Sequence, residues 1–272
     1  MKIVLASTLL LCSSFTFAHD YNNSCDVDIH GGMKITQQDI SFFKQAVTET
    51  SSDQSSLYTI HNDQQLYVHG KQVDLTSKQQ ELVSNYAHHI RTMVPKVKQV
   101  ANEGIDLAIE GVSVAFNELL GNDNDVSNEL VLELTKVKNQ VNERFDENKP
   151  LYINEKGING DDVFDEEFER HIESTVETAV KKSIGSVLIA VGREMMFSDG
   201  DAFEQKMEKF GDKMEATMEV KANKIEQKVS GLCLSMKKID QLEEALKDNI
   251  SQLPDFNVLS VEQHEKSREQ AE

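Results

Sequence analysis

The stretch ANEGIDLAIEGVSVAFNELL, residues 101–120, decides the fold class. Drawn as a helix, it carries two apolar stripes side by side. One stripe consists of small residues: Ala101, Gly104, Ala108, Gly111 and Ala115. The other consists of large residues: Ile105, Ile109, Val112, Phe116 and Leu119. A helix that is apolar around most of its circumference is normally enclosed by other helices. The segment therefore predicts the central helix of a helical body, with another backbone passing close to the small stripe.

This helix begins far upstream of residue 101. Thr76-Ser77-Lys78-Gln79 forms a capping box, in which the Thr hydroxyl and the Gln side chain each satisfy an unpaired backbone amide. Apolar residues then recur, at the spacing of an α-helix, up to Leu119. We expect Pro95 to kink or split this helix.

Three further helices are predicted from the same periodicity. They span residues 125–147, about 161–195, and 198–250, and Gly231 is expected to interrupt the last one. The third helix carries small residues between Ala179 and Ala190, which we expect to meet the small stripe of residues 101–115.

Residues 24–75 have a different period. Short runs alternate between apolar and polar residues and are bounded by Gly, Asn and Asp, which is the pattern of strands and hairpins. The predicted fold is therefore mainly α within the α+β class. A small antiparallel β-meander (19–75) packs on a body of long, antiparallel, partly coiled-coil-like helices (76–250) as one folded unit. The acidic tail, 251–272, is expected to be disordered.

The first eighteen residues have the pattern of a secretory signal peptide. Lys2 precedes an apolar run, and Thr16-Phe17-Ala18 has the small-x-small form of a cleavage site. We expect cleavage after Ala18 and a periplasmic location. Leu11 precedes Cys12 where a lipoprotein would have Gly or Ala, so no lipid anchor is expected, and no later segment is long enough for a transmembrane helix.

The charge of the chain limits its partners. Lys and Arg number 28 against 47 Asp and Glu, giving a net charge of −19, or −20 without residues 1–18. Such a surface repels nucleic acid and anionic lipid headgroups. We therefore predict no nucleic-acid binding and a preference for protein partners with basic flanks.

Two cysteines, Cys25 and Cys233, remain after processing. In an oxidising compartment an isolated pair is most simply a disulfide, with two free thiols as the alternative. No nucleophile elbow, phosphate loop, EF-hand or metal-ligand spacing is present, so we predict no catalytic residue, no metal and no cofactor.

The order of features resembles the YggN-like family, secreted bacterial proteins of unassigned function. The resemblance rests on Cys25, the run LYVHGKQVDLT at 66–76, the long helix containing Pro95, and Gly231-Leu232-Cys233. It implies a periplasmic location, a helical body and a cysteine near each end.

Three functional hypotheses follow. The first is a non-enzymatic protein that binds a partner protein or apolar segment, in an interaction or holdase-like role, through an apolar strip on the last helix: Phe203, Met207, Phe210, Met214 and Met218. Methionine suits adaptable binding surfaces. The second is a carrier of a small amphiphile, held in a closed apolar pocket between the central and third helices. The third is an enzyme of unrecognised type, which would place titratable groups with shifted pKa values in a cleft.

Overall fold

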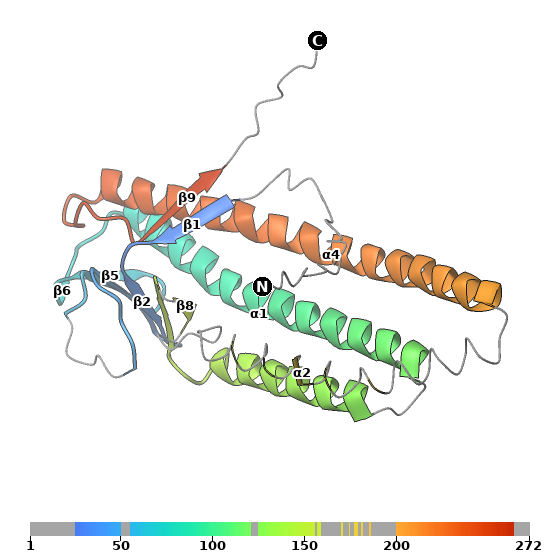
Figure 1. Cartoon of the computed structure of the whole chain (residues 1–272). Coiled ribbons are helices and arrows are strands. Elements are labelled where there is room, and N and C mark those ends of the chain that lie inside the picture. The colour runs from blue at the N-terminus through green and yellow to red at the C-terminus, as the bar shows by residue number, and fades with distance from the viewer. Residues whose placement is uncertain are drawn as a thin grey trace, which may run out of the picture.

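The computed structural model describes residues 25–49, 55–120, 125–155, 157–158 and 200–263, with a few isolated positions between 170 and 185. In this part of the chain an antiparallel sheet lies at one end, and three long helices extend away from it (Figure 1). The helices are α1 (Ser77–Leu120), α2 (Asp125–Arg144) and α4 (Gly200–Asn249).

The larger sheet of the described residues has seven antiparallel strands in the order β6-β5-β4-β3-β2-β7-β8. These strands are β2 (Gly32–Ile35), β3 (Asp39–Phe43), β4 (Tyr58–His61), β5 (Gln65–Val68), β6 (Lys71–Gln72), β7 (Leu151–Asn154) and β8 (Gly157–Ile158). Strand β2 pairs with β3 on one side and with β7 on the other. Chain segments before α1 and after α2 therefore belong to one sheet.

The sequence-based fold class, mainly α with a small N-terminal meander, is wrong. The fold is a mixed α+β fold, because the sheet is large and extends beyond residues 19–75. Strand β3 departs from strict alternation of apolar and polar residues, because Ile40, Phe42 and Phe43 are all buried. Strand β7 joins the sheet by pairing with the free edge of β2, and β8 pairs with β7. Local periodicity in the sequence does not show which strand pairs with which.

The long helices are continuous where breaks were expected. Thr76 N–H donates to Gln79 Oε1 at 2.9 Å, which confirms the capping box at the start of α1. Pro95 lies within α1, and Gly231 lies within α4. A proline removes one backbone hydrogen bond and a glycine costs only about 1 kcal/mol, so packing against neighbouring elements overrides both.

Helix α1 lies between α4 and α2 (Figure 1). Lys228 and Lys221 of α4 bind Glu103 and Glu110 of α1, and this register shows that the two helices are antiparallel. On the other side, Lys138 Nζ of α2 lies 2.6 Å from Asp106 Oδ1. Long polar side chains therefore bridge the distal halves of the helices.

The small stripe of α1 is not a site of close backbone approach in the described structure. Ala108 is exposed. A Cβ atom added at Gly104 would meet no atom within 4 Å, and one at Gly111 would meet only Met218 Sδ at 3.9 Å. The expected close packing of another helix on this stripe stays a prediction. The segment expected to pack there, 179–190, lies almost entirely outside the described residues.

The main core lies where the sheet meets the proximal halves of α1 and α4. Phe42 stacks on Tyr58 with ring centroids 4.2 Å apart and on Tyr86 of α1 at 5.6 Å. Residues of α4 complete the cluster, with Ile239, Leu242, Leu246 and Ile250 all buried. The three helices extend from this junction (Figure 1).

A second, two-stranded sheet pairs β1 (Cys25–Ile29) with β9 (Leu259–Gln263). The expectation that residues 251–272 form a disordered tail is therefore wrong for β9. Val258 and Leu259 are buried, and burial of their side chains stabilises a segment whose polar composition predicted disorder. Residues 264–272 lie outside the described part of the chain.

Candidate functional site

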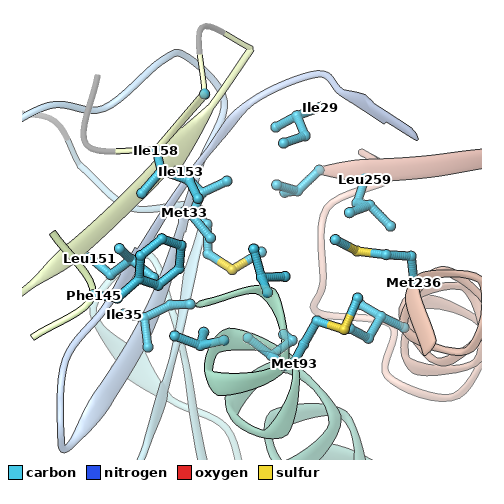
Figure 2. Close-up of a pocket in the computed structure, with 16 residues that line it drawn as sticks. Ile29, Met33, Ile35, Met93, Phe145, Leu151, Ile153, Ile158, Met236 and Leu259 are labelled. Atoms are coloured by element: carbon cyan, nitrogen blue, oxygen red, sulfur yellow. The ribbon is translucent and has the colours of Figure 1, made fainter. Parts of the chain in front are cut away.

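An apolar cavity of about 180 Å³ lies between the larger sheet, α1, α4 and the β1–β9 pair. Figure 2 shows its side chains arranged around an empty centre. Every lining residue is apolar or glycine: Ile29, Met33, Ile35, Ile90, Met93, Val94, Val97, Phe145, Leu151, Ile153, Gly157, Ile158, Met236, Ile239, Val258 and Leu259.

Strand register builds the sheet wall of the cavity. Met33 of β2 is paired with Ile153 of β7, which is in turn paired with Ile158 of β8. In the next row of the same face, Ile35 is paired with Leu151. Residues two apart on a strand point to one side of a sheet, so these rows form one continuous apolar surface.

Helical spacing builds the opposite wall. Ile90, Met93, Val94 and Val97 of α1 lie three or four residues apart and share one face. Met236 and Ile239 of α4 have the same relationship. The β1–β9 pair closes a third side, where Ile29 is paired with Leu259.

Residues in the interior of the cavity are more buried than residues at its rim. Its interior residues, such as Met33, Ile90, Met93 and Val258, are buried. Val97, Ile153, Ile158 and Met236 are half-buried and Gly157 is exposed, so the open side lies along the β7–β8 hairpin and the facing helices. A site with this lining has no group for acid–base, nucleophilic or metal chemistry. It can hold an apolar molecule or the apolar part of an amphiphile.

A buried carboxyl group lies beside the cavity but does not line it. Glu243 of α4 is 2% exposed, and its oxygens accept hydrogen bonds from the Val258 and Leu259 N–H groups at 3.0 and 3.3 Å. Burial raises the pKa of Glu243, against the opposing effect of these bonds. Burial also raises the pKa of Tyr58, whose hydroxyl donates to Glu243 Oε1 at 3.4 Å. The group is enclosed by protein, so its geometry indicates a structural role.

A family model described as "Protein of unknown function (DUF2884)" matches residues 25–259. The chain belongs to the DUF2884 family. No curated protein and no solved structure matches it. The expected resemblance to an uncharacterised family is confirmed at this level, while the finer YggN-like name stays a prediction.

The structure places only part of the predicted apolar strip of this DUF2884 protein. Phe210, Met214 and Met218 are half-buried on the distal half of α4. The side chains of Phe203 and Met207 lie outside the described residues. The strip is separate from the cavity, which sits at the proximal end of α4 near Met236.

The predicted disulfide is not tested. Cys233 is buried on α4. Cys25 begins β1, but its side chain lies outside the described residues. The Cys25–Cys233 bond therefore stays a prediction.

Two histidines outside the cavity lie within hydrogen-bond distance of another side chain. His61 Nδ1 lies 2.6 Å from Asp39 Oδ1, and His30 Nε2 lies 2.8 Å from Ser260 Oγ. Within the described ranges, no group of three His, Cys, Asp or Glu residues could hold a metal ion. None of the helices in those ranges is long and apolar enough to cross a membrane.

Sequence reasoning missed the cavity. Its residues come from seven helices and strands, together with Phe145 after α2 and Val258 before β9, and each fits an ordinary core pattern within its own segment. The weak signal was methionine at Met33, Met93 and Met236, since flexible Met fills irregular spaces where Leu or Ile would pack regularly.

Proposed function

We propose that this DUF2884 protein is a non-enzymatic carrier that holds a small apolar or amphiphilic molecule in the cavity between sheet and helices. The observation that supports the proposal is the wholly apolar lining of a space of about 180 Å³. Apolar cavities of similar size stay dry and take up small apolar molecules. The proposed position differs from the one expected from sequence, between the central and third helices.

An empty cavity of this kind lowers stability. At about 24 cal/mol per Å³, 180 Å³ corresponds to roughly 4 kcal/mol, an upper figure because one side of the cavity is open. This is a large fraction of the free energy of unfolding of a typical domain, which is about 5–15 kcal/mol. A bound apolar molecule would restore the missing contacts, so ligand binding and folding stability are coupled.

The side chains that line the cavity can also adapt to ligands of different shapes. Met33, Met93 and Met236 come from three different elements, β2, α1 and α4, and surround the centre of the cavity (Figure 2). Unbranched side chains with several rotatable bonds adapt to ligands of different outline. The site therefore favours a class of apolar molecules over one exact shape.

The test uses 1-octanol, a neutral amphiphile, with calorimetric titration and thermal unfolding. Octanol should bind the full-length mature protein and raise its melting temperature. Val97→Phe places a larger side chain at the half-buried rim and should lower octanol affinity by about tenfold or more. Leu132→Phe, on the exposed face of α2, is the matched control and should bind like the unmodified protein. Absence of octanol binding, or equal binding by both variants, would overturn the proposal.

A second candidate is the partner-binding role predicted from the strip. It is favoured by apolar side chains that α4 leaves uncovered: Met214 and Met218 of the strip are only half-buried, and Val220 and Leu234, on the opposite side of the helix, are 56% and 65% exposed. An amphipathic segment with basic flanks would complement the Met214 and Met218 side of α4 and the net charge of −19.

This second role is tested by light scattering from an unfolding basic client protein. Suppression of aggregation should disappear in Met214→Ser/Met218→Ser and persist in Leu132→Ser, which removes an exposed leucine from another helix. Helicity of both variants is checked by circular dichroism. Suppression that is equal in all three proteins would contradict the role.

We also propose that the protein is secreted to the periplasm, after cleavage following Ala18, which accords with the apolar run of residues 3–11. The intact mass of the protein from periplasmic extract should lack residues 1–18 and carry no acyl chain. A mass that retains these residues would contradict the proposal.

A further inference from the structure

A second hollow, of about 270 Å³, lies directly beside the apolar cavity. The two share Ile35, Val94, Phe145 and Leu151, so these four side chains form a partition between them. Unlike the cavity, this hollow is lined by cationic side chains: Arg91, Lys98, Arg144 and Lys149. We refer to it as the basic hollow. Two carboxylates, Asp146 and Glu147, also line it.

This local charge is opposite to that of the whole chain. Four cations and two anions line the basic hollow, whereas Asp and Glu exceed Lys and Arg by 19 overall. Even when Asp63, which pairs with Arg91, is counted, the hollow keeps a positive excess. Charges farther away than about 8 Å are largely screened at physiological ionic strength, so the local groups dominate the potential there.

Arg91 is held in place by two of its guanidinium nitrogens, while the third has no hydrogen-bond acceptor among the described residues. Its Nε donates to Asp63 Oδ1 and its Nη1 to the Thr36 carbonyl oxygen, both at 2.6 Å. Its Nη2 is buried and has no hydrogen-bond acceptor in the described part of the chain. A buried guanidinium nitrogen without an acceptor is unfavourable. Nη2 is enclosed by protein, so an anionic oxygen in the hollow would bind it only after a small shift of the Arg91 side chain.

Lys98 fixes a second positive charge at the partition. Its Nζ donates to the carbonyl oxygen of Phe145 at 3.3 Å, which keeps the ammonium group next to the wall that separates the two spaces. Asp146 is already engaged, because Asn148 N–H and Nδ2 each donate to its Oδ1 at 3.0 Å. Those bonds, and more weakly Lys149 and Lys98, lower the pKa of Asp146.

We propose that the ligand of this protein is a single-chain amphiphile with an anionic carboxylate headgroup. The chain occupies the apolar cavity, and the carboxylate occupies the basic hollow, where Arg91 and Lys98 bind it. Extension of the molecule from one space to the other requires Phe145 and Leu151 of the partition, which are both buried, to change rotamer. This inference rests on the proposed carrier function and specifies the class of ligand.

The experiment compares three probes of equal chain length: octanoate, 1-octanol and octyltrimethylammonium. Affinities are measured by calorimetry at pH 8, where octanoate is ionised. Octanoate should bind about tenfold more tightly than octanol, because charge-assisted hydrogen bonds add to the same apolar contact. The cationic probe should bind most weakly, and the advantage of octanoate should shrink as salt is added.

Charge-removing variants locate the headgroup. Lys98→Met/Lys149→Met should weaken the preference for octanoate over octanol, because it removes two of the four cations that line the hollow. Lys96→Met is the matched control, since Lys96 is exposed on the same helix and lines neither space. It should keep the preference. Melting temperatures of all variants establish that they fold.

The outcomes separate the two proposals. If octanol binds and octanoate binds no more tightly, the headgroup assignment is overturned while the carrier function stands. The same holds if Lys96→Met loses the preference as fully as the double variant. If neither octanol nor octanoate binds, both proposals are overturned.

Discussion

Glu243 holds Val258 by a direct hydrogen bond: the backbone N–H of Val258 donates to Glu243 Oε1 at 3.0 Å. The neighbouring Leu259 N–H donates to Oε2 at 3.3 Å. Val258 and Leu259 both line the apolar cavity, and Leu259 begins β9. One buried carboxyl group on α4 therefore positions the cavity wall that the C-terminal segment contributes.

This relationship predicts how stability depends on pH. Burial raises the pKa of Glu243 above its ordinary value of 4.5, so in the folded state this group binds its proton at a higher pH than in the unfolded state. Between the two values the folded state binds more protons, and the free energy of unfolding falls as pH rises. Glu243→Gln should remove this contribution, which is measured by urea unfolding of both proteins from pH 4 to pH 8.

Glu244→Gln is the control of opposite sign. The hydrogen bond from Lys247 lowers the pKa of Glu244, so its contribution is present above the ordinary pKa and is lost as pH falls through the lowered value. Glu244 is half-exposed and its effect should be small. If both variants change the pH profile in the same direction, the assignment of Glu243 is wrong.

A pair of substitutions tests where the core lies. Leu246→Ala should lower the free energy of unfolding by about 2–5 kcal/mol, because Leu246 is 2% exposed in the cluster between sheet and helices. Ala108→Leu should change it by less than about 0.5 kcal/mol, since Ala108 is exposed on α1. Urea unfolding measures both. A larger effect at Ala108 would restore the close helix contact that the structure does not show.

The start of α1 is tested at the capping box. Thr76→Ala removes the hydroxyl that accepts from Gln79 N–H at 3.4 Å and should cost about 1 kcal/mol. Thr135→Ala, at an exposed position inside α2, is the matched control. It should have little effect or slightly stabilise, since Ala has the higher helix propensity. Equal destabilisation by both would argue against a cap at Thr76.

The disulfide prediction is tested with the native, unreduced protein. A bond between Cys25 and Cys233 would close most of the chain into one loop and disfavour the unfolded state by up to about 5 kcal/mol. Reduction should therefore lower the melting temperature, and Cys25→Ser/Cys233→Ser should melt at the lower temperature with or without reductant. Two thiols that titrate freely before reduction would exclude the bond.

The sequence by itself determined the local elements of this protein. The capping box at Thr76 and the apolar spacing after it predicted α1, and the same spacing predicted α2 and α4 nearly to their observed ends. Alternation predicted the strands near Cys25, Met33, Tyr58 and Leu66. These features depend on residues within one or two turns, or within one hairpin, so they can be read without knowing the rest of the chain.

Only the tertiary structure decided which elements meet. The pairing of β2 with β7 and of β1 with β9 joins segments that are more than a hundred residues apart, and an unpaired strand edge carries no mark of its partner in the sequence. The cavity and the basic hollow follow from those pairings. Met33, Met93 and Met236 become neighbours, and Arg91 and Lys149 come to line one space in an acidic chain, because long-range packing sets side-chain surroundings that local periodicity does not contain.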